Sequence, residues 1–200
     1  FHPEQTAEEL ETIKLAASLN DFMGLNYYQP SRVELIKGSL EQREATRENS
    51  TGAPGNPSFD GFFRTVKMDD KRYTKWDWEI SPEGFVAGLN MLKDRYGQVK
   101  IYITENGLGD EDPIVEDEIC DVPRIKYISE HLTALKQAIS DGVNVKGYFA
   151  WSVIDLLSWL NGYKKQYGFI YVDHKNNYQR KKKMSFHWFS SVIKNRGEDL

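Results

Sequence analysis

The sequence predicts an α/β fold in which parallel β-strands alternate with α-helices. Three short apolar segments, at residues 21–28, 99–104 and 145–151, have the composition of buried strands. Segments with helical periodicity precede the first strand, separate the three strands and follow the last one. Such alternation implies parallel pairing with right-handed crossovers. Two architectures fit this order, a part of a (β/α)8 (TIM) barrel and a small open sheet.

The helices are delimited by capping residues. Thr6 and Glu9 form a capping box at the start of the first helix, and Ser81, with a proline after it, starts the second. Gly97 and Gly142 end the second and third helices. The predicted helices cover residues 7–19, 82–96, 123–141 and 184–194. In the third helix, apolar residues spaced three and four apart predict the buried face: Ile125, Ile128, Leu132, Leu135 and Ile139.

Three other segments are predicted to be irregular or exposed. Residues 29–79 show no clear periodicity, and loops of such length are often functional. The acidic run at residues 109–121 lacks the ligand spacing of a calcium loop and is predicted to be solvated. The basic run from Arg180 to Lys183 is predicted to be a solvated turn before the last helix.

Composition narrows the class of protein. The chain has 200 residues, of which 40% are hydrophobic and 28% charged, as in folded globular proteins. A net charge of −4 gives no support for a nucleic-acid partner, although residues 151–200 hold nine Lys and Arg against four Asp and Glu and favour an anionic ligand locally. The single cysteine, Cys120, excludes an intrachain disulfide and favours a reducing cytoplasm. No apolar run predicts a membrane span, and the four histidines show no metal-binding spacing.

Polar and aromatic residues follow each predicted strand. Asn26 and Tyr28 lie at the end of the first strand, Glu105 at the end of the second and Trp151 at the end of the third. In a barrel these ends share one rim, where active sites lie. A carboxylate, an amide, a phenol and an indole are typical of a carbohydrate site. From the residues alone, Glu105 is either a rigidly held nucleophile or a cap on the turn that follows it. Tyr28 could equally be a core aromatic, and for Trp151 a structural role in the core is favoured.

Four stretches resemble glycoside hydrolase family one, the retaining β-glycosidases. They are ITENG, DFMGLNYYQP, WDWEISPEG and GYFAWSVIDLLSW, whose order and spacing match that family over nearly the whole chain. The resemblance implies that residues 1–200 form a single partial domain, the C-terminal part of a TIM barrel with about three of its strands. It also implies that Glu105 is the nucleophile, that Tyr28 donates a hydrogen bond to it, that Asn26 contacts the sugar and that Trp151 lies beneath the sugar ring.

One departure from the family pattern concerns substrate choice. Ordinary β-glucosidases of the family carry Phe-Glu-Trp after the eighth strand, where this chain has a leucine, Ser158 and Trp159. A serine does not repel an anion as a glutamate does, and Lys165 and Tyr167 follow within the same segment. This set resembles the 6-phospho-β-glycosidase branch and implies that Ser158, Lys165 and Tyr167 bind a 6-phosphate. Lys164 is expected to be a solvated neighbour, and an exposed loop is the alternative for both lysines.

The sugar preference and the state of the chain are inferred from the same resemblance. Trp159 is similar to the phospho-galactosidase branch and YGFIYVD to the phospho-glucosidase branch, and we favour 6-phospho-β-glucosidase. The substrate would be a phosphorylated disaccharide or an aryl β-glycoside 6-phosphate, with no cofactor. The family's general acid, in an Asn-Glu-Pro motif, does not occur in the 200 residues. We therefore expect a fragment without turnover of its own, which needs the N-terminal half of the barrel or self-association for stability.

Two other functions remain open at this stage. One is a β-glucosidase that acts on unphosphorylated sugars, and the other is a non-catalytic module that binds sugar phosphates.

Overall fold

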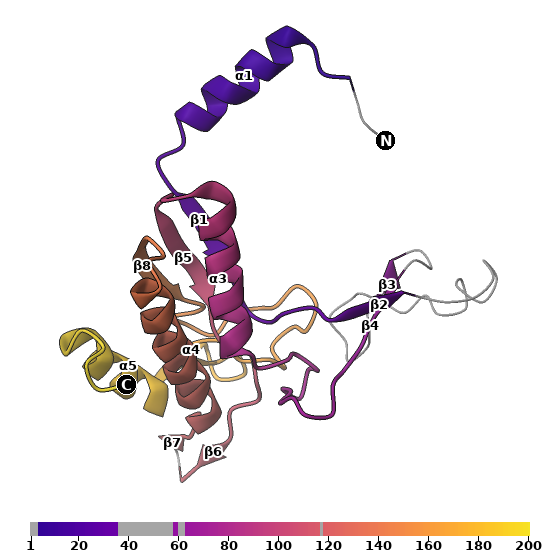
Figure 1. Cartoon of the computed structure of the whole chain (residues 1–200). Coiled ribbons are helices and arrows are strands. Elements are labelled where there is room, and N and C mark those ends of the chain that lie inside the picture. Colours follow the sequence, from indigo (N-terminus) through magenta and orange to yellow (C-terminus); the bar gives the residue numbers. More distant parts are fainter. Residues whose placement is uncertain (1–3, 36–57, 60–62, 117) are drawn as a thin grey trace, which may run out of the picture.

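The computed structural model of the protein describes residues 4–35, 58–59, 63–116 and 118–200. Its centre is a three-stranded parallel sheet in the order β1 (Met23–Asn26), β5 (Ile101–Asn106) and β8 (Val145–Ala150). The helices α3 (Pro82–Tyr96) and α4 (Val122–Ser140) connect these strands and lie side by side (Figure 1). The predicted alternation of parallel strands and helices is confirmed.

The main core lies between the sheet and these two helices. It is built from Phe85 and Leu89 of α3, Ile101 and Ile103 of β5 and Leu135 of α4, all of them buried. Burying large aliphatic and aromatic side chains stabilises the layer by about 25 cal/mol per Å² of apolar surface removed from water. One face of β5 is therefore fixed against the helices, and this fixes the end of the strand as well.

The other face of the sheet and its edges are more open than predicted. No residue of β1 or β8 is buried, and Phe149 of β8 is exposed. The expectation of three buried strands is therefore wrong for these two. The physical reason is their position, because each lies at an edge of the sheet and has a neighbouring strand on one side only among the described residues.

The helix signals of the sequence are confirmed with small differences. The capping box of Thr6 and Glu9 opens α1 (Ala7–Ser18), and the Ser81 hydroxyl accepts a hydrogen bond from the third residue of α3. Gly97 follows α3 with a φ of 71°, and α5 spans Met184–Lys194. Ile139, expected on the buried face of α4, is 47% exposed, and the neighbouring Ala138 takes the core position instead, fully buried.

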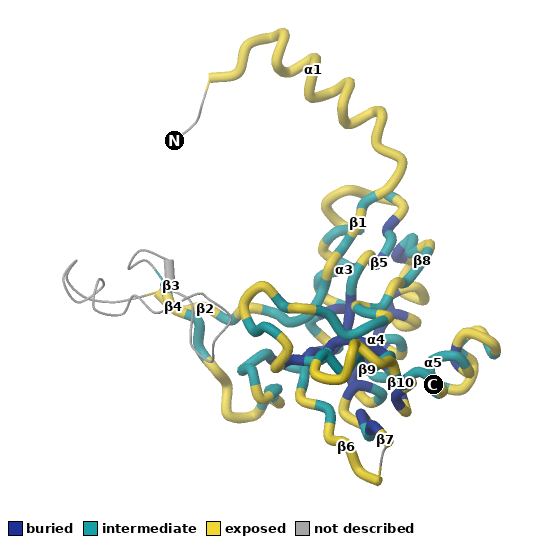
Figure 2. The backbone as a smooth tube through the Cα atoms, turned by 180° about the vertical axis from the view of Figure 1, so that it is seen from behind, coloured by how far each residue is buried: buried dark blue, intermediate teal, exposed yellow. Residues whose placement is uncertain are grey.

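The helix α1 stands apart from the rest. Figures 1 and 2 show it projecting from the sheet with exposed residues along its whole length. None of its residues is buried. In the described part of the chain, no helix is long and apolar enough to cross a lipid bilayer.

Residues 29–79 contain more regular structure than predicted. The strands β2 (Val33–Leu35), β4 (Phe63–Thr65) and β3 (Ser58–Phe59) form a small antiparallel sheet to one side of the molecule (Figure 1). Strands of two or three residues are too short to show an alternating pattern and therefore could not be predicted from the sequence. Most of the central stretch, residues 50–61, lies outside the described residues.

The two charged runs are solvated in part, and each contains regular structure and one fully buried charge. Arg180 belongs to β10 (Gln179–Lys182), which pairs with β9 (Ile170–Asp173), and Lys183 is fully buried. The acidic run forms the hairpin of β6 (Ile114–Val115) and β7 (Glu118–Ile119), and Asp121 is fully buried. The predictions are wrong only for the ends of the runs, where each buried charge finds an opposite charge or a donor far away in the sequence, whereas Glu111, Glu118, Arg180 and Lys182 are exposed as expected.

Candidate active site

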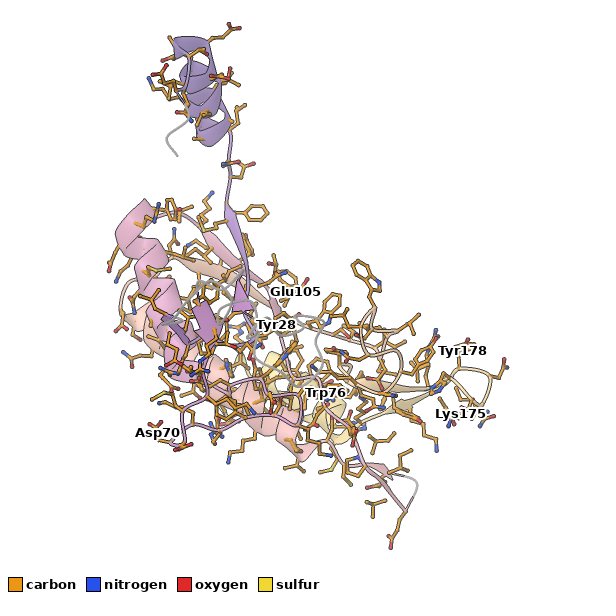
Figure 3. The ribbon with its side chains drawn as sticks, turned by 90° about the vertical axis from the view of Figure 1, so that its right-hand side faces the viewer. Tyr28, Asp70, Trp76, Glu105, Lys175 and Tyr178 are labelled. Atoms are coloured by element: carbon orange, nitrogen blue, oxygen red, sulfur yellow. The ribbon has the colours of Figure 1, made fainter. Side chains whose placement is uncertain are left out.

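Glu105 and Tyr28 meet where β5 and β1 end. The two strands are parallel neighbours, with Asn26 opposite Glu105 in the register, so their carboxyl ends share one edge of the sheet. The Tyr28 hydroxyl donates a hydrogen bond to Oε2 of Glu105 at 2.6 Å, and Figure 3 shows the two side chains next to one another. Burial, together with the Glu105 carboxylate, raises the pKa of Tyr28 far above its usual range. The phenol therefore stays protonated and acts as a donor.

Asn26 extends this edge of the site. Its side-chain oxygen accepts a hydrogen bond from the hydroxyl of Thr104 at 2.6 Å, and both residues are exposed. Thr104 alternates with the buried Ile103 along β5, so it lies on the face opposite α3 and α4. The Asn26 amide is thus held on the open face of the sheet, beside the strand that carries Glu105.

A glycine lets β8 end close to β5, the strand that carries Glu105. A Cβ atom on Gly107 would lie 1.8 Å from the backbone oxygen of Trp151, so no other residue fits here without a shift of the backbone. The backbone amide of Trp151 also donates to the backbone carbonyl of Asn106 at 2.9 Å. Trp151 is 36% exposed at the end of β8. Gly107, directly after the end of β5, thus allows the backbones of β5 and Trp151 to pack closely, which brings the Trp151 indole to the edge where Glu105 lies.

Lys165 is a buried cation that forms no ion pair among the described residues, and the Asp110 carboxylate only partly offsets the effect of burial on its pKa. The Lys165 side chain is 1% exposed, and Nζ has no hydrogen-bond partner among the described residues. Nζ lies 3.5 Å from the ring centroid of Trp78, 5.1 Å from that of Trp76 and 5.5 Å from that of Tyr167. Contact with aromatic faces stabilises a cation only in part. Burial lowers the pKa of Lys165 to about 8.

A chain of contacts links Lys165 to Glu105. The Trp78 ring that lies under the Lys165 ammonium also packs edge-on against Tyr28, with the ring centroids 5.6 Å apart. Tyr28 in turn bonds to Glu105. Gly109 makes room for the cation, because a Cβ atom there would lie 2.4 Å from the Lys165 side chain. The sequence reasoning missed Trp78 and Trp76, although the WDWE stretch was a possible signal.

The segment that carries Lys165 and Tyr167 is held by buried charges. One carboxylate oxygen of Asp155 accepts from the Tyr167 amide at 3.1 Å, and the Tyr167 carbonyl accepts from Arg124 at 3.1 Å. Asp155 also accepts from Lys183 at 2.7 Å. Arg124 and Asp155 are two further residues, after Trp78 and Trp76, that the sequence reasoning missed. No pattern identifies them, because a charged residue in a helix or loop is normally solvated.

Ser158 and Trp159 lie in a separate turn. Ser158 exchanges two backbone hydrogen bonds with Gly162, at 2.9 and 2.8 Å, and its hydroxyl accepts from the amide of Asn161. Trp159 is 100% exposed. Of the expected phosphate ligands, the structure therefore brings together Lys165 and Tyr167, whereas no contact in the described part of the chain joins Ser158 to them.

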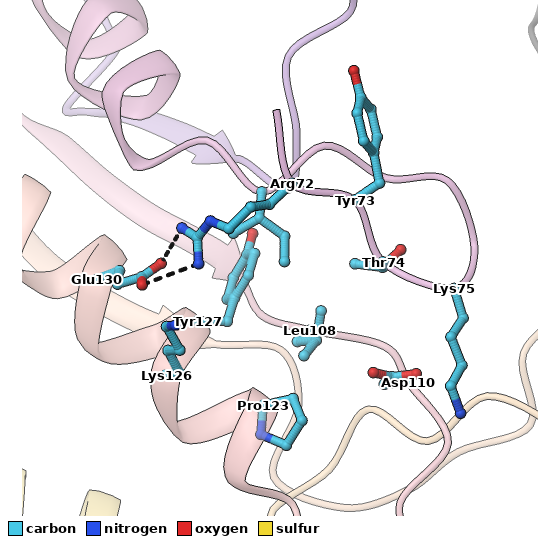
Figure 4. Close-up of a pocket in the computed structure, with 11 residues that line it drawn as sticks. Arg72, Tyr73, Thr74, Lys75, Leu108, Asp110, Pro123, Lys126, Tyr127 and Glu130 are labelled. Carbon is cyan, nitrogen blue, oxygen red and sulfur yellow. Dashed lines mark hydrogen bonds and ion pairs between the residues drawn. The ribbon is translucent and has the colours of Figure 1, made fainter. Parts of the chain in front are cut away.

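A small pocket beside α4 lacks the features of a ligand site. It has a volume of about 210 Å³ and lies between residues 72–80 and the start of α4 (Figure 4). Arg72 closes one wall through an ion pair with Glu130 at 2.6 Å, and Lys75 pairs with Glu111 at 3.1 Å. Its charges largely pair with neighbours and its volume lies below the usual range for ligand sites, so we assign it no ligand.

A carboxylate, a phenol and aromatic rings at the carboxyl ends of parallel strands are typical of barrel enzymes that act on sugars. Comparison with known proteins defines the family. The model of glycosyl hydrolase family 1 matches residues 1–198. The chain belongs to glycosyl hydrolase family 1.

Two curated relatives have the same degree of similarity. An aryl-phospho-β-D-glucosidase of Bacillus subtilis is 42% identical over 193 residues, which are 93% of this chain and 40% of that protein. A 6-phospho-β-galactosidase of Clostridium acetobutylicum is 42% identical over 187 residues, which are 92% of this chain and 38% of that protein. The chain thus spans about two fifths of the length of these relatives.

Solved structures confirm the fold. A family 1 β-glucosidase from Thermotoga maritima superposes with a TM-score of 0.78 at 32% identity, over 98% of this chain and 39% of that one. The same organism's β-glucosidase in complex with azafagomine gives 0.74 at 34% identity, over 90% and 36% of the two chains. The fold is therefore part of a (β/α)8 barrel, as the sequence predicted, and the small open sheet is excluded as the complete architecture.

Proposed function

We propose that the full-length enzyme, of which this chain is a part, hydrolyses 6-phospho-β-glycosides with retention of configuration. The observation that carries the proposal is the Lys165 ammonium, which is buried on Trp78 and forms no hydrogen bond or ion pair among the described residues, although the Asp110 carboxylate partly offsets its burial. A buried charge is costly until an opposite charge compensates it. A phosphate group on the substrate would supply that charge, and Trp78 and Tyr28 connect this position to Glu105.

In this proposal Glu105 is the nucleophile. One carboxylate oxygen attacks the anomeric carbon, the bond to the leaving oxygen breaks, and a general acid protonates that oxygen. Water, deprotonated by the same group, then releases the sugar from Glu105. The general acid would come from the part of the barrel outside this chain. Tyr28 orients the carboxylate, Trp151 supports the sugar ring and Asn26 contacts a hydroxyl.

Three residues of the loop after β8 would hold the phosphate. Lys165 supplies the charge, and the hydroxyls of Tyr167 and Ser158 supply directional donors. The Ser158 hydroxyl already accepts a hydrogen bond from Asn161, which leaves its own proton free to donate. Trp159, fully exposed beside Ser158, would contact the substrate in this proposal.

We propose the glucoside as the preferred sugar and the cytoplasm as the location. The curated relatives include a phospho-glucosidase and a phospho-galactosidase at equal identity, so the preference rests on the YGFIYVD segment. Phosphorylated sugars arise where uptake phosphorylates them, which favours the cytoplasm. Assays of the full-length enzyme with the nitrophenyl 6-phosphates of glucose and galactose, side by side, test the preference.

We propose further that this chain alone has no turnover. The exposed apolar residues Phe149 and Val153 and the open edges of β1 and β8 leave a surface that the rest of the barrel would cover. Self-association would be a substitute for that cover. Hydrolysis of a 6-phosphoglycoside by the isolated chain, lost in Glu105→Gln, would contradict this.

The experiment that tests the activity uses the full-length enzyme and its Glu105→Gln variant. We expect the wild-type enzyme to hydrolyse nitrophenyl β-glucoside 6-phosphate and the variant to be inactive. A plain β-glucosidase is the second candidate, because the solved structures with high similarity are β-glucosidases. It would hydrolyse the unphosphorylated glycoside at least as well. Binding of glucose 6-phosphate without any turnover would instead indicate a non-catalytic module.

A further inference from the structure

A fully buried side-chain amide, that of Asn106, follows Glu105 at the end of β5. Asn106, the residue after Glu105, is 0% exposed. Its side-chain nitrogen donates to the carbonyl of Tyr27 at 2.8 Å and to the hydroxyl of Tyr127 at 3.3 Å. Its side-chain oxygen accepts from the hydroxyl of Tyr148 at 2.8 Å. The amide thus ties β5 to the end of β1, to α4 and to β8.

Tyr127 passes this connection on to Tyr28. Its hydroxyl donates to the carbonyl of Tyr28 at 2.7 Å, from a ring that is buried in α4. The ring stacks on His131 with the centroids 3.9 Å apart. Burial lowers the pKa of His131 to about 4, so this stack is between two neutral rings near neutral pH. The helix therefore holds the backbone of the residue whose side chain bonds to Glu105.

The protonation of the two phenols determines the direction of each hydrogen bond in this network of Asn106, Tyr127 and Tyr148. Burial raises the pKa of Tyr127 and of Tyr148 well above the usual range, so both phenols keep their protons. Tyr127 uses its single proton on the Tyr28 carbonyl, and its oxygen receives the Asn106 amide proton. Buried polar chains of this kind lose a bond without replacement when one member is removed.

We propose that Tyr127 is a positioning residue for the reaction, which acts by holding the Tyr28 backbone so that the Tyr28 phenol stays on Glu105. This rests on the function proposed above. The other backbone bond at this point runs from the Tyr27 amide to the Glu105 carbonyl at 2.9 Å and fixes the strand, not the Tyr28 carbonyl. Small displacements of catalytic groups reduce the rate of the chemical step more than they reduce binding.

The test is a double-mutant cycle on the full-length enzyme with Tyr127→Phe, Tyr28→Phe and the double variant. We expect Tyr127→Phe to lower kcat about tenfold with KM changed less than about twofold, since misplacement affects the reacting geometry. On the Tyr28→Phe background, the same substitution should have almost no further effect, because the contact that it positions is already gone.

Tyr27→Phe is the matched control. The Tyr27 hydroxyl also donates to a backbone carbonyl, that of Ser81 at 2.8 Å, but it does not contact Tyr28 or Glu105. We expect a similar loss of thermal stability and little change in kcat. Equal effects of Tyr127→Phe and Tyr27→Phe on kcat, or multiplicative effects of Tyr127→Phe and Tyr28→Phe, would overturn the proposal.

Two further variants, Tyr148→Phe and Glu105→Gln, allow the proposal to be tested if Tyr127→Phe does not fold and separate it from the proposed function. If Tyr127→Phe does not fold, Tyr148→Phe replaces it in the cycle. This substitution removes the hydrogen bond from Tyr148 to Asn106, which lies one contact further from Tyr28 than Tyr127 does. Its effect on kcat should also vanish on the Tyr28→Phe background. An additive effect there would overturn the proposal too. Activity retained in Glu105→Gln would refute the proposed nucleophile, whereas an inactive Glu105→Gln with an additive cycle would refute only the role of Tyr127.

Discussion

The Lys165 ammonium lies 3.5 Å from the ring centroid of Trp78, and no described oxygen accepts a hydrogen bond from it. Trp78 also packs against Tyr28, which bonds to Glu105. The proposed phosphate-binding lysine, Lys165, and the proposed nucleophile, Glu105, are therefore connected through the rings of Trp78 and Tyr28. This relationship makes the substrate proposal testable at single residues.

Replacement of Lys165 should separate phosphorylated from plain substrates. We expect Lys165→Ala in the full-length enzyme to lower kcat/KM for nitrophenyl β-glucoside 6-phosphate by about 10- to 100-fold, the value of a hydrogen bond to a charged group. Activity on the unphosphorylated glycoside should stay within about twofold, because Lys165 would contact only the phosphate. Steady-state kinetics on both substrates measure this.

Lys164→Ala is the control for this substitution. Lys164 is the exposed neighbour of Lys165, and removing it deletes the same charge from the same loop. It should leave the preference between the two substrates unchanged. Equal losses on both substrates in Lys165→Ala would favour the plain β-glucosidase.

The same lysine predicts a pH dependence. Burial lowers the pKa of Lys165 to about 8, so the ammonium is present below that pH and is lost as the pH rises through it. We therefore expect kcat/KM for the phosphorylated substrate to fall above about pH 8, relative to kcat/KM for the plain one. In Lys165→Arg this decline should disappear, because a guanidinium keeps its proton at these pH values. An identical alkaline decline on both substrates would show that another group titrates.

Gly107 should tolerate no side chain. A Cβ atom there would collide with the Trp151 oxygen at 1.8 Å, so Gly107→Ala must displace backbone at the proposed active site. We expect a loss of several kcal/mol in stability and a large loss of activity, measured by thermal unfolding and kinetics. Gly88→Ala is the comparison, because it lies within α3 with no atom within 4 Å of the added Cβ. It should stabilise the protein by about 0.5–1 kcal/mol.

The buried lysine before α5 should matter for stability. Lys183 bonds to Asp112 at 2.6 Å and to Asp155 at 2.7 Å, and its side chain is fully buried, with the two carboxylate side chains 4% and 8% exposed. Lys183→Met would leave the carboxylates short of a positive charge, at a cost of about 3–5 kcal/mol. Denaturant unfolding measures the loss. Lys175→Met, at an exposed turn, should change the free energy of unfolding by less than about 0.5 kcal/mol, and an equal effect of the two would contradict the role of the ion pairs.

Parts of this molecule with strong local signals were predictable. Thr6, Ser81 and Gly97 limit their helices as the sequence indicated, because caps act through neighbouring backbone groups. The meeting of Tyr28 with Glu105 was also predictable, since the ends of neighbouring parallel strands share an edge. In these cases a short stretch of sequence, or a rule of topology, determines the result.

Other parts depend on partners that are distant in the sequence. Arg124 is 1% exposed and binds Asp112 and the backbone of residues near 167, yet its place in a helix predicts a solvated side chain. Lys183 looks like the end of a basic run, but two carboxylates from other loops surround it. The pattern of one segment contains no information on the charges that it will meet, and these positions could not be derived from it.

The turn of Ser158 and Gly162 closes on itself by two backbone hydrogen bonds, and Trp159 at its tip is fully exposed. Its anchor, Asp155, is held separately by Lys183 and by the Tyr167 amide. Because the tip and the anchor are independent, residues at the tip can be exchanged with little penalty in folding. If the proposed site is correct, this loop is the place where a directed library could vary substrate choice without a change at Glu105.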